Sequence, residues 1–376
     1  MKTLPLLLAS LTLAGCARGT RTEAPVARSG EGAMRAYPAA SDRVLVMGRH
    51  VDEGGAVGFA ASGVTFFMKF RGTSMDIELE DERRDSTTHN WFTVVVDGGE
   101  PVRLRTSPSQ RRYTLASGLP LGVHTIALSK ATEGQNGRHR LIDVHTGELL
   151  VPDPLPERRI EFVGNSITSG YGLDPRPLAC DAGTWYDQTH AWLAYGPRVA
   201  RRVNAQWMLS SVSGIGMHRN WNSDAPAMPR VYGGVYMEYA DTLSAWDFAR
   251  YTPDLVVVAL GTNDFSDGGG KTPRPALDGP AFVRDYTRFV AGVRARYPRA
   301  RLLLLTSPTI DSTRNARLGD YLRQVIAARA AAGDSALATY AWKGRYVAGC
   351  NGHPGLEEHV RMADELEPVV RAAMGW

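Results

Sequence analysis

The sequence predicts two successive domains of different fold class: an antiparallel β-sandwich of jelly-roll type, then a three-layer α/β/α domain with a parallel sheet. Two observations predict this. Apolar residues recur with period two between about Arg43 and Asp143, and from Arg159 onward apolar strands alternate with helix-like segments. The predicted segments are a signal peptide at 1–15, a flexible tether at 16–38, the β-sandwich at 39–155 and the α/β domain at 156–376.

The first fifteen residues have the pattern of an export signal. Lys2 precedes an apolar run, Leu4–Ala14, which is too short to span a membrane. The tetrad ending at Cys16 resembles the lipobox of bacterial lipoproteins. This resemblance implies an acylated Cys16 that anchors the exported chain to a membrane of the cell envelope, at the outer membrane or cell surface. The alternative is an ordinary signal peptide whose cysteine has no role. The tether holds almost nothing apolar to bury.

Charge and cysteine content limit the partners and the compartment. The formal net charge is +4, and it falls to +3 without residues 1–15, where Lys2 is the only charged residue. A balance this small argues against nucleic acid as a partner. After export, Cys180 and Cys350 would meet an oxidising compartment. Two interpretations stay open for this pair, a disulfide or two separate buried thiols.

Runs of period two predict the strands of the first domain. Val64–Met68, Met75–Leu79 and Phe92–Val96 are three of them, and turn residues such as Asp97-Gly98-Gly99 separate the runs. Seven or eight short strands without a helical stretch indicate a β-sandwich. The proline-rich Pro152–Pro156 then stiffens the connection to the second domain.

The second domain is predicted to contain a parallel sheet covered by helices on both faces, because its strands are apolar throughout. The expected strands are Ile160–Val163, Trp207–Leu209, Leu255–Leu260, Leu302–Leu305 and Leu337–Tyr340. The clearest helix is expected at Ala281–Tyr297, where apolar residues follow one face. In such sheets ligands bind beyond the carboxyl ends of the strands. Ser166, Gly214 and Asn263 each follow an expected strand at that edge, so they can converge.

These residue types suit acyl transfer. Ser166 lies in Gly-Asn-Ser-Ile-Thr, where a strand gives way to a helix, and can serve as nucleophile once a base takes its proton. The N–H groups of Ser166 and Gly214 and the side-chain amide of Asn263 can donate to the oxyanion of a tetrahedral intermediate. His353, on a loop before the terminal helix, is the candidate base. Asp264 is interpreted as a structural hydrogen-bonding residue, and His359 as part of a solvated helix face.

The same blocks carry a family resemblance. Gly-Asn-Ser-Ile at Ser166, the glycine at Gly214, Gly-Thr-Asn-Asp around Asn263 and the late His353-Pro354 resemble the four blocks of the SGNH (GDSL-type) hydrolases. The chain is more similar still to carbohydrate esterase family 2, which places a jelly-roll domain before the SGNH domain. This resemblance implies an exported esterase that removes O-acetyl groups from plant-type polysaccharides such as xylan or glucomannan, without a metal or other cofactor.

Two positions depart from the family pattern. Members of the wider superfamily often have an aspartate three residues before the histidine, and the esterase family commonly has one two residues before it, where this chain has Cys350 and Asn351. Within the family a backbone carbonyl can orient the histidine, and Asn351 could help through its side chain or main chain. A neutral acceptor stabilises imidazolium less than a carboxylate does. Asn165 replaces the usual aspartate before the serine and is expected to fix the loop.

Aromatic side chains on loops after the strands could stack on sugar rings. The candidates are Tyr171, Trp185, Trp221 and Tyr232; any single one is more often core packing than a sugar contact, and one or two of the group are expected to stack on sugar. Two alternatives to a polysaccharide deacetylase stay open: an SGNH esterase acting on another acyl ester or on cell-wall glycan, and a carbohydrate-binding protein that has lost catalysis. The sequence leaves undetermined the polysaccharide, the acetylated hydroxyl, the role of the β-sandwich and the oligomeric state.

Overall fold

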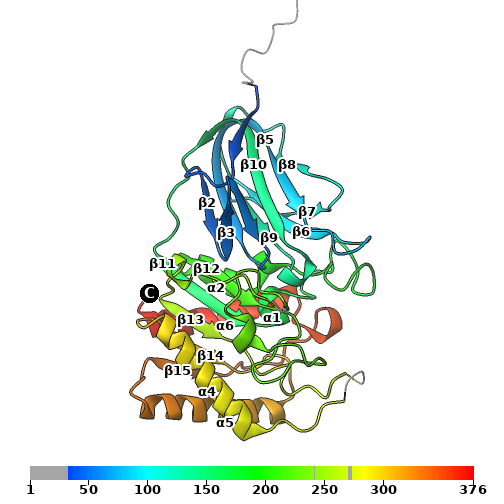
Figure 1. Ribbon diagram of the computed structural model, residues 1–376. Helices are drawn as coiled ribbons and strands as arrows, with labels where there is room; N and C mark the ends of the chain where they lie inside the picture. The colour runs from blue at the N-terminus through cyan, green and yellow to red at the C-terminus, as the bar shows by residue number, and fades with distance from the viewer. Residues whose placement is uncertain (1–32, 241, 270–272) are drawn as a thin grey trace, which may run out of the picture. The chain divides into compact units, whose positions relative to one another are not determined.

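The computed structural model describes residues 33–240, 242–269 and 273–376 (Figure 1). The expected signal peptide and the acylation site at Cys16 lie outside these ranges. Two sheets form the framework, one of ten antiparallel strands from Arg35 to Leu150 and one of five parallel strands that begins at Arg158. The predicted change of fold class is confirmed.

The antiparallel domain has more strands than the seven or eight expected. They are β1 (Arg35–Pro38), β2 (Val44–Met47), β3 (His50–Glu53), β4 (Ala56–Phe59), β5 (Thr65–Asp81), β6 (Asn90–Val96), β7 (Val102–Thr106), β8 (Arg112–Ala116), β9 (Gly122–Lys130) and β10 (His139–Leu150). Two of the predicted runs, at Val64–Met68 and Met75–Leu79, are one long strand, β5. Its first half pairs with β2 and β9, its second half pairs with β8, and β10 pairs along parts of both halves, so this one strand connects several neighbours of the sheet.

The second domain is a parallel sheet of order β12-β11-β13-β14-β15. Its strands are β11 (Arg158–Gly164), β12 (Ala205–Ser211), β13 (Leu255–Val258), β14 (Arg301–Leu305) and β15 (Leu337–Tyr340). Its helices are α1 (Ser166–Ser169), α2 (Tyr195–Arg202), α3 (Met228–Val231), α4 (Gly279–Arg296), α5 (Ser312–Ala331) and α6 (Leu356–Met374). The chain visits β12 on one side of β11 and then β13 on the other, which makes the carboxyl end of β11 the topological switch point.

Helices cover both faces of the parallel sheet (Figure 1). Within β13, Val256 and Val258 pack in one apolar cluster with α4 and α5, whereas Leu255 and Val257 pack in another with α2 and α6. Alternate residues of a strand point to opposite faces, which explains why this strand is apolar throughout. The predicted three-layer arrangement is therefore confirmed.

Candidate active site

Ser166 begins helix α1 two residues after β11 ends. A side chain at Gly164 would clash with Thr168, so only glycine allows this tight strand-to-helix turn. The Asn165 side chain accepts a hydrogen bond from Ile167 N at 3.1 Å, which caps the helix and fixes the loop as the sequence predicts. The serine is thereby held at the switch point of the sheet.

His353 lies in hydrogen-bond contact with Ser166. The distance from Ser166 Oγ to His353 Nε2 is 2.8 Å, and His353 Nδ1 lies 3.1 Å from the main-chain oxygen of Asn351. A carbonyl can only accept, so Nδ1 carries the proton and Nε2 is free to accept the serine proton. Burial lowers the pKa of His353 to about 4, although its hydrogen bonds to the backbone act to raise it. The imidazole is therefore unprotonated at pH 7 and can accept the serine proton.

Asn351 orients the histidine through its main chain rather than its side chain. Its backbone has a φ of 54°, a left-handed conformation that asparagine tolerates better than most residues. The side-chain amide instead donates to the Tyr171 hydroxyl at 2.8 Å. The histidine loop thus uses a main-chain carbonyl to hold His353.

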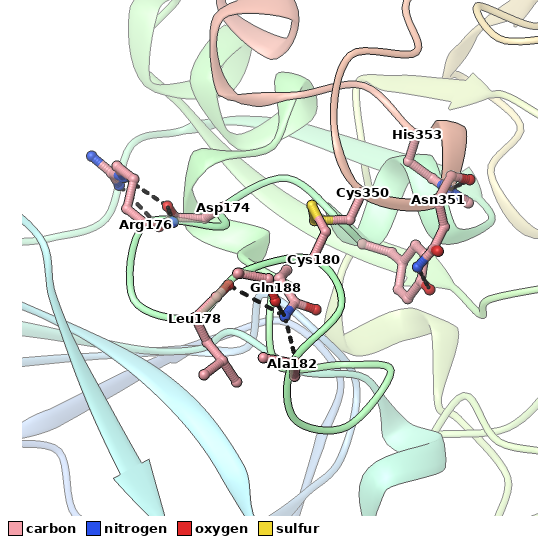
Figure 2. Close-up of a disulfide and its surroundings, with 11 residues drawn as sticks. Asp174, Arg176, Leu178, Cys180, Ala182, Gln188, Cys350, Asn351 and His353 are labelled. Carbon is pink, nitrogen blue, oxygen red and sulfur yellow. Dashed lines mark hydrogen bonds and ion pairs between the residues drawn. A yellow bond between two sulfur atoms is a disulfide. The ribbon is translucent and has the colours of Figure 1, made fainter.

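A disulfide between Cys180 and Cys350 supports this loop (Figure 2). Its Cα atoms lie 5.1 Å apart, and it joins the residue before Asn351 to the segment between α1 and α2. The Cys350 N–H also donates to Gly172 O at 2.9 Å. Of the two interpretations that the sequence left open, the structure has the disulfide.

Gly214 and Asn263 lie on adjoining loops beyond β12 and β13. The Asn263 side-chain amide donates to Ile215 O at 2.7 Å, so the two candidate oxyanion donors are physically linked. Gly214 has a φ of 78°, in the region that favours glycine. No protein acceptor is present for its N–H within residues 33–240, 242–269 and 273–376. Buried Asp264 accepts hydrogen bonds from the N–H groups of residues 217–219, which agrees with a structural role.

Three of the four candidate aromatic residues are linked to this centre by contacts. The Tyr171 ring meets His353 edge to face at 4.5 Å and lies 5.9 Å from the Trp185 ring. Trp185 is 46% exposed and Trp221 39% exposed, and Trp221 N donates to Gly214 O at 2.9 Å. Trp185 is therefore linked to His353 through the Tyr171 ring, and Trp221 to the Gly214 loop through its main chain.

The prediction that Tyr232 offers a stacking surface is wrong. Its side chain is 1% exposed, and its hydroxyl donates to Glu161 Oε2 at 2.8 Å. The Arg49 guanidinium lies 5.0 Å above its ring and forms a fully buried ion pair with Glu161 at 3.1 Å. Tyr232 is therefore part of a buried polar cluster that joins the two domains.

The solvated position expected for His359 is also wrong. This side chain is fully buried, its Nδ1 accepts from Tyr195 N at 3.1 Å, and burial lowers its pKa to about 3. Its charged neighbours Glu357 and Arg361 are exposed, whereas Glu358 is buried with His359 and accepts main-chain hydrogen bonds. Sequence reasoning also missed Glu133, a buried carboxylate of the β-sandwich that binds Ser213. A lone glutamate in a loop gives no local signal of such a contact.

Three side chains of types that can bind a metal ion lie close together on the β-sandwich. Glu78, Asp143 and His145, from β5 and β10, have ligand atoms within 4.8 Å of one another. None of them hydrogen-bonds to Ser166 or His353 in the described ranges. They are separate from the centre built around these two residues.

Comparisons with known proteins match both domains. Residues 46–154 match the family model for the carbohydrate esterase 2 N-terminal domain, and residues 162–361 match the GDSL-like lipase/acylhydrolase family. An acetylxylan esterase/glucomannan deacetylase from Cellvibrio japonicus is 29% identical over 351 residues, which cover 90% of this chain and 91% of that protein. The cellulase/esterase CelE of Acetivibrio thermocellus is 31% identical over 84% of this chain but only 38% of its own length.

Solved structures agree with the sequence relatives. A family two carbohydrate esterase from Cellvibrio japonicus superposes with a TM-score of 0.81 at 25% identity, covering 91% of this chain and 98% of that one. Another, from Clostridium thermocellum in complex with cellohexaose, has a TM-score of 0.80 at 27% identity, with coverage of 89% and 99%. The resemblance read from the sequence blocks is confirmed at the level of the fold and of both family models.

Proposed function

We propose that this chain, which belongs to the GDSL-like lipase/acylhydrolase family and within it to the family two carbohydrate esterases, uses Ser166 and His353 to remove O-acetyl groups from polysaccharides of the xylan or glucomannan type. The observation that carries the assignment of residues is the 2.8 Å contact between Ser166 Oγ and His353 Nε2, with Nδ1 held by a carbonyl.

The proposed reaction is acyl transfer in two halves. His353 Nε2 takes the proton as Ser166 Oγ attacks the acetyl carbonyl, and it returns that proton to the departing sugar hydroxyl. A water molecule, activated by the same imidazole, then hydrolyses the acetyl-enzyme and restores the serine. Because a neutral carbonyl and not a carboxylate faces Nδ1, the imidazolium of the transition state gains less stabilisation, and the oxyanion donors must supply more.

The proposed oxyanion donors are the N–H groups of Ser166 and Gly214 and the side-chain amide of Asn263. Ser166 opens a helix, so its N–H has no partner within that helix. Asn263 gives one amide proton to Ile215 O and keeps a second for the substrate. Losing one such donor typically costs about 10²–10³ in kcat.

A carbohydrate substrate is supported by the exposed rings beside the centre. Trp185 and Trp221 present apolar faces of the kind on which sugar rings stack. Gly183 and Thr184, which precede Trp185, line a groove of about 840 Å³ that also includes Trp91 of the β-sandwich. Relatives whose names specify acetylxylan and glucomannan point to the same class of substrate.

Export and lipid anchoring at Cys16 are part of this proposal. They rest on the apolar leader and the tetrad that ends at Cys16. In the described part of the chain, no helix is both long enough and apolar enough to cross a membrane. Labelling of the expressed protein with radioactive palmitate, compared with Cys16→Ala, tests the anchor; an unlabelled wild type would contradict it.

Covalent labelling tests the assigned nucleophile. Incubation with a fluorophosphonate should add one phosphonyl group to the peptide that contains Ser166 and abolish ester hydrolysis, whereas Ser166→Ala should stay unlabelled. Labelling of a different serine in the active wild type would overturn the assignment. Hydrolysis of 4-nitrophenyl acetate without acetate release from either polysaccharide would favour the alternative of another acyl ester as substrate.

A further inference from the structure

A short segment of the β-sandwich, residues 133–135, contacts the loop that carries Gly214. Glu133 is 1% exposed, and its carboxylate accepts hydrogen bonds from Ser213 N at 2.6 Å and from the Ser213 hydroxyl. A side chain at Gly134 would clash with the main chain of Tyr236 and Met237, so glycine allows the close approach. The two domains meet directly at the residue before the proposed oxyanion donor.

Gln135 binds the carbonyl oxygen of the peptide bond that contains the Gly214 N–H. Its side-chain amide donates to Ser213 O at 3.3 Å, and the Tyr239 hydroxyl donates to the same oxygen at 3.5 Å. The bond between Ser213 and Gly214 is trans, so its carbonyl and its N–H point in opposite directions. Because the Ser213 carbonyl is held toward the β-sandwich, the Gly214 N–H points away from the β-sandwich. The hydrogen bonds to this carbonyl also polarise the Gly214 N–H.

The same carboxylate reaches the helix of the nucleophile. The Ser169 hydroxyl donates to Glu133, and Ser169 Oγ lies 2.8 Å from Ser211 Oγ, at the end of β12. Ser169 is the last residue of α1, which begins at Ser166. Glu133 thus connects the element that holds the nucleophile with the loop that holds the donor.

The segment is itself held firmly. Lys130, fully buried, donates to Glu133 O at 2.9 Å and to Thr132 O at 3.0 Å, and Glu133 N donates to the Asn136 side chain at 3.2 Å. A carboxylate and an amide on such a rigid support can define the position of a loop to the fraction of an ångström that oxyanion stabilisation needs.

We propose that Glu133 and Gln135 are positioning residues for the esterase reaction, through which the β-sandwich sets the orientation of the Gly214 N–H. Neither touches the substrate or the reacting atoms. This inference rests on the proposed function, in which Gly214 donates to the oxyanion. It gives the N-terminal domain a part in catalysis that is separate from binding polysaccharide.

Kinetics of three variants test the inference. Gln135→Met keeps the length of the side chain and removes its donor, and Glu133→Gln keeps the shape and removes the charge. A misoriented donor should lose part of the rate enhancement that one oxyanion donor supplies. The kcat for 4-nitrophenyl acetate should therefore fall about 10-fold with little change in KM. The matched control is Glu238→Gln, which weakens another contact between the domains, the 2.6 Å pair with Arg138. It should leave kcat unchanged.

Inhibition by phenylboronic acid separates positioning from stability. Its tetrahedral adduct on Ser166 places an oxygen where the oxyanion forms, so Ki should rise by the factor by which kcat falls. A purely structural role would lower the melting temperature without this parallel rise. If the wild type is active and the variants keep kcat and Ki within twofold of it, the positioning role is wrong but the proposed function stands. An inactive wild type would overturn the proposed function and the positioning role with it.

Discussion

The low pKa of His353 predicts an esterase that stays active in mild acid. Burial lowers this pKa from 6.5 to about 4, so the imidazole keeps its basic form until the pH approaches 4 and loses it below. Because kcat/KM reports the free enzyme, its acid limb should fall near pH 4. At pH 5.5 a pKa of 4 leaves about 97% of the imidazole neutral, against about 9% for a pKa of 6.5. At pH 5.5, kcat/KM should therefore stay close to its plateau at neutral pH, whereas an enzyme whose histidine had a pKa of 6.5 would keep only about a tenth of its plateau.

The assay is kcat/KM for 4-nitrophenyl acetate from pH 3.5 to 8 at constant ionic strength, read at the isosbestic wavelength of the product. Asn351→Asp provides a matched perturbation, because it places a carboxylate beside the His353 loop at almost constant shape. A nearby negative charge favours imidazolium, so the acid limb of this variant should move to higher pH. A wild-type limb near pH 6.5, or a variant limb that does not move, would refute the reasoning.

Three further predictions concern the disulfide, the buried ion pair and the Gly214 conformation. Cys180→Ser opens a link that spans 170 residues, so the free energy of unfolding should fall by about 2–5 kcal/mol in urea titrations, and an unchanged midpoint would count against it. Arg49→Met leaves the carboxylate of its fully buried partner without a counter-ion, which should cost about 3–5 kcal/mol by the same titration; a loss below about 1 kcal/mol would contradict this. Gly214→Ala meets no atom within 4 Å, so its cost should be conformational, about 1–2 kcal/mol, while kcat falls at least about 10-fold as the loop relaxes. Full activity of this variant would show that the φ of 78° is irrelevant to catalysis.

Local pattern was enough to predict the fold class and the placement of the nucleophile. The parallel strands fall within a few residues of the expected ranges because their burial on both faces leaves continuous apolar runs, as in β13 (Leu255–Val258). The position of Ser166 follows from the same rule, since the residues that follow a parallel strand and begin the next helix lie at the carboxyl edge of the sheet.

Contacts between distant segments could not be predicted in this way. Tyr232 and His359 were misplaced because each has a polar atom satisfied by a partner far away in sequence, Glu161 for the one and Tyr195 for the other. A buried polar residue with such a partner has the same local sequence as an exposed one. The same holds for Glu133, because the partners of its carboxylate lie in the other domain.

Acetate release from acetylated xylan and glucomannan tests the central claim most directly. The purified protein should release acetate from at least one of the two polysaccharides. The Ser166→Ala variant, with an unchanged melting temperature, should release none while still binding the polymer. Equal release by the variant would contradict the assigned nucleophile, and binding without release by the wild type would identify a carbohydrate-binding protein that has lost catalysis.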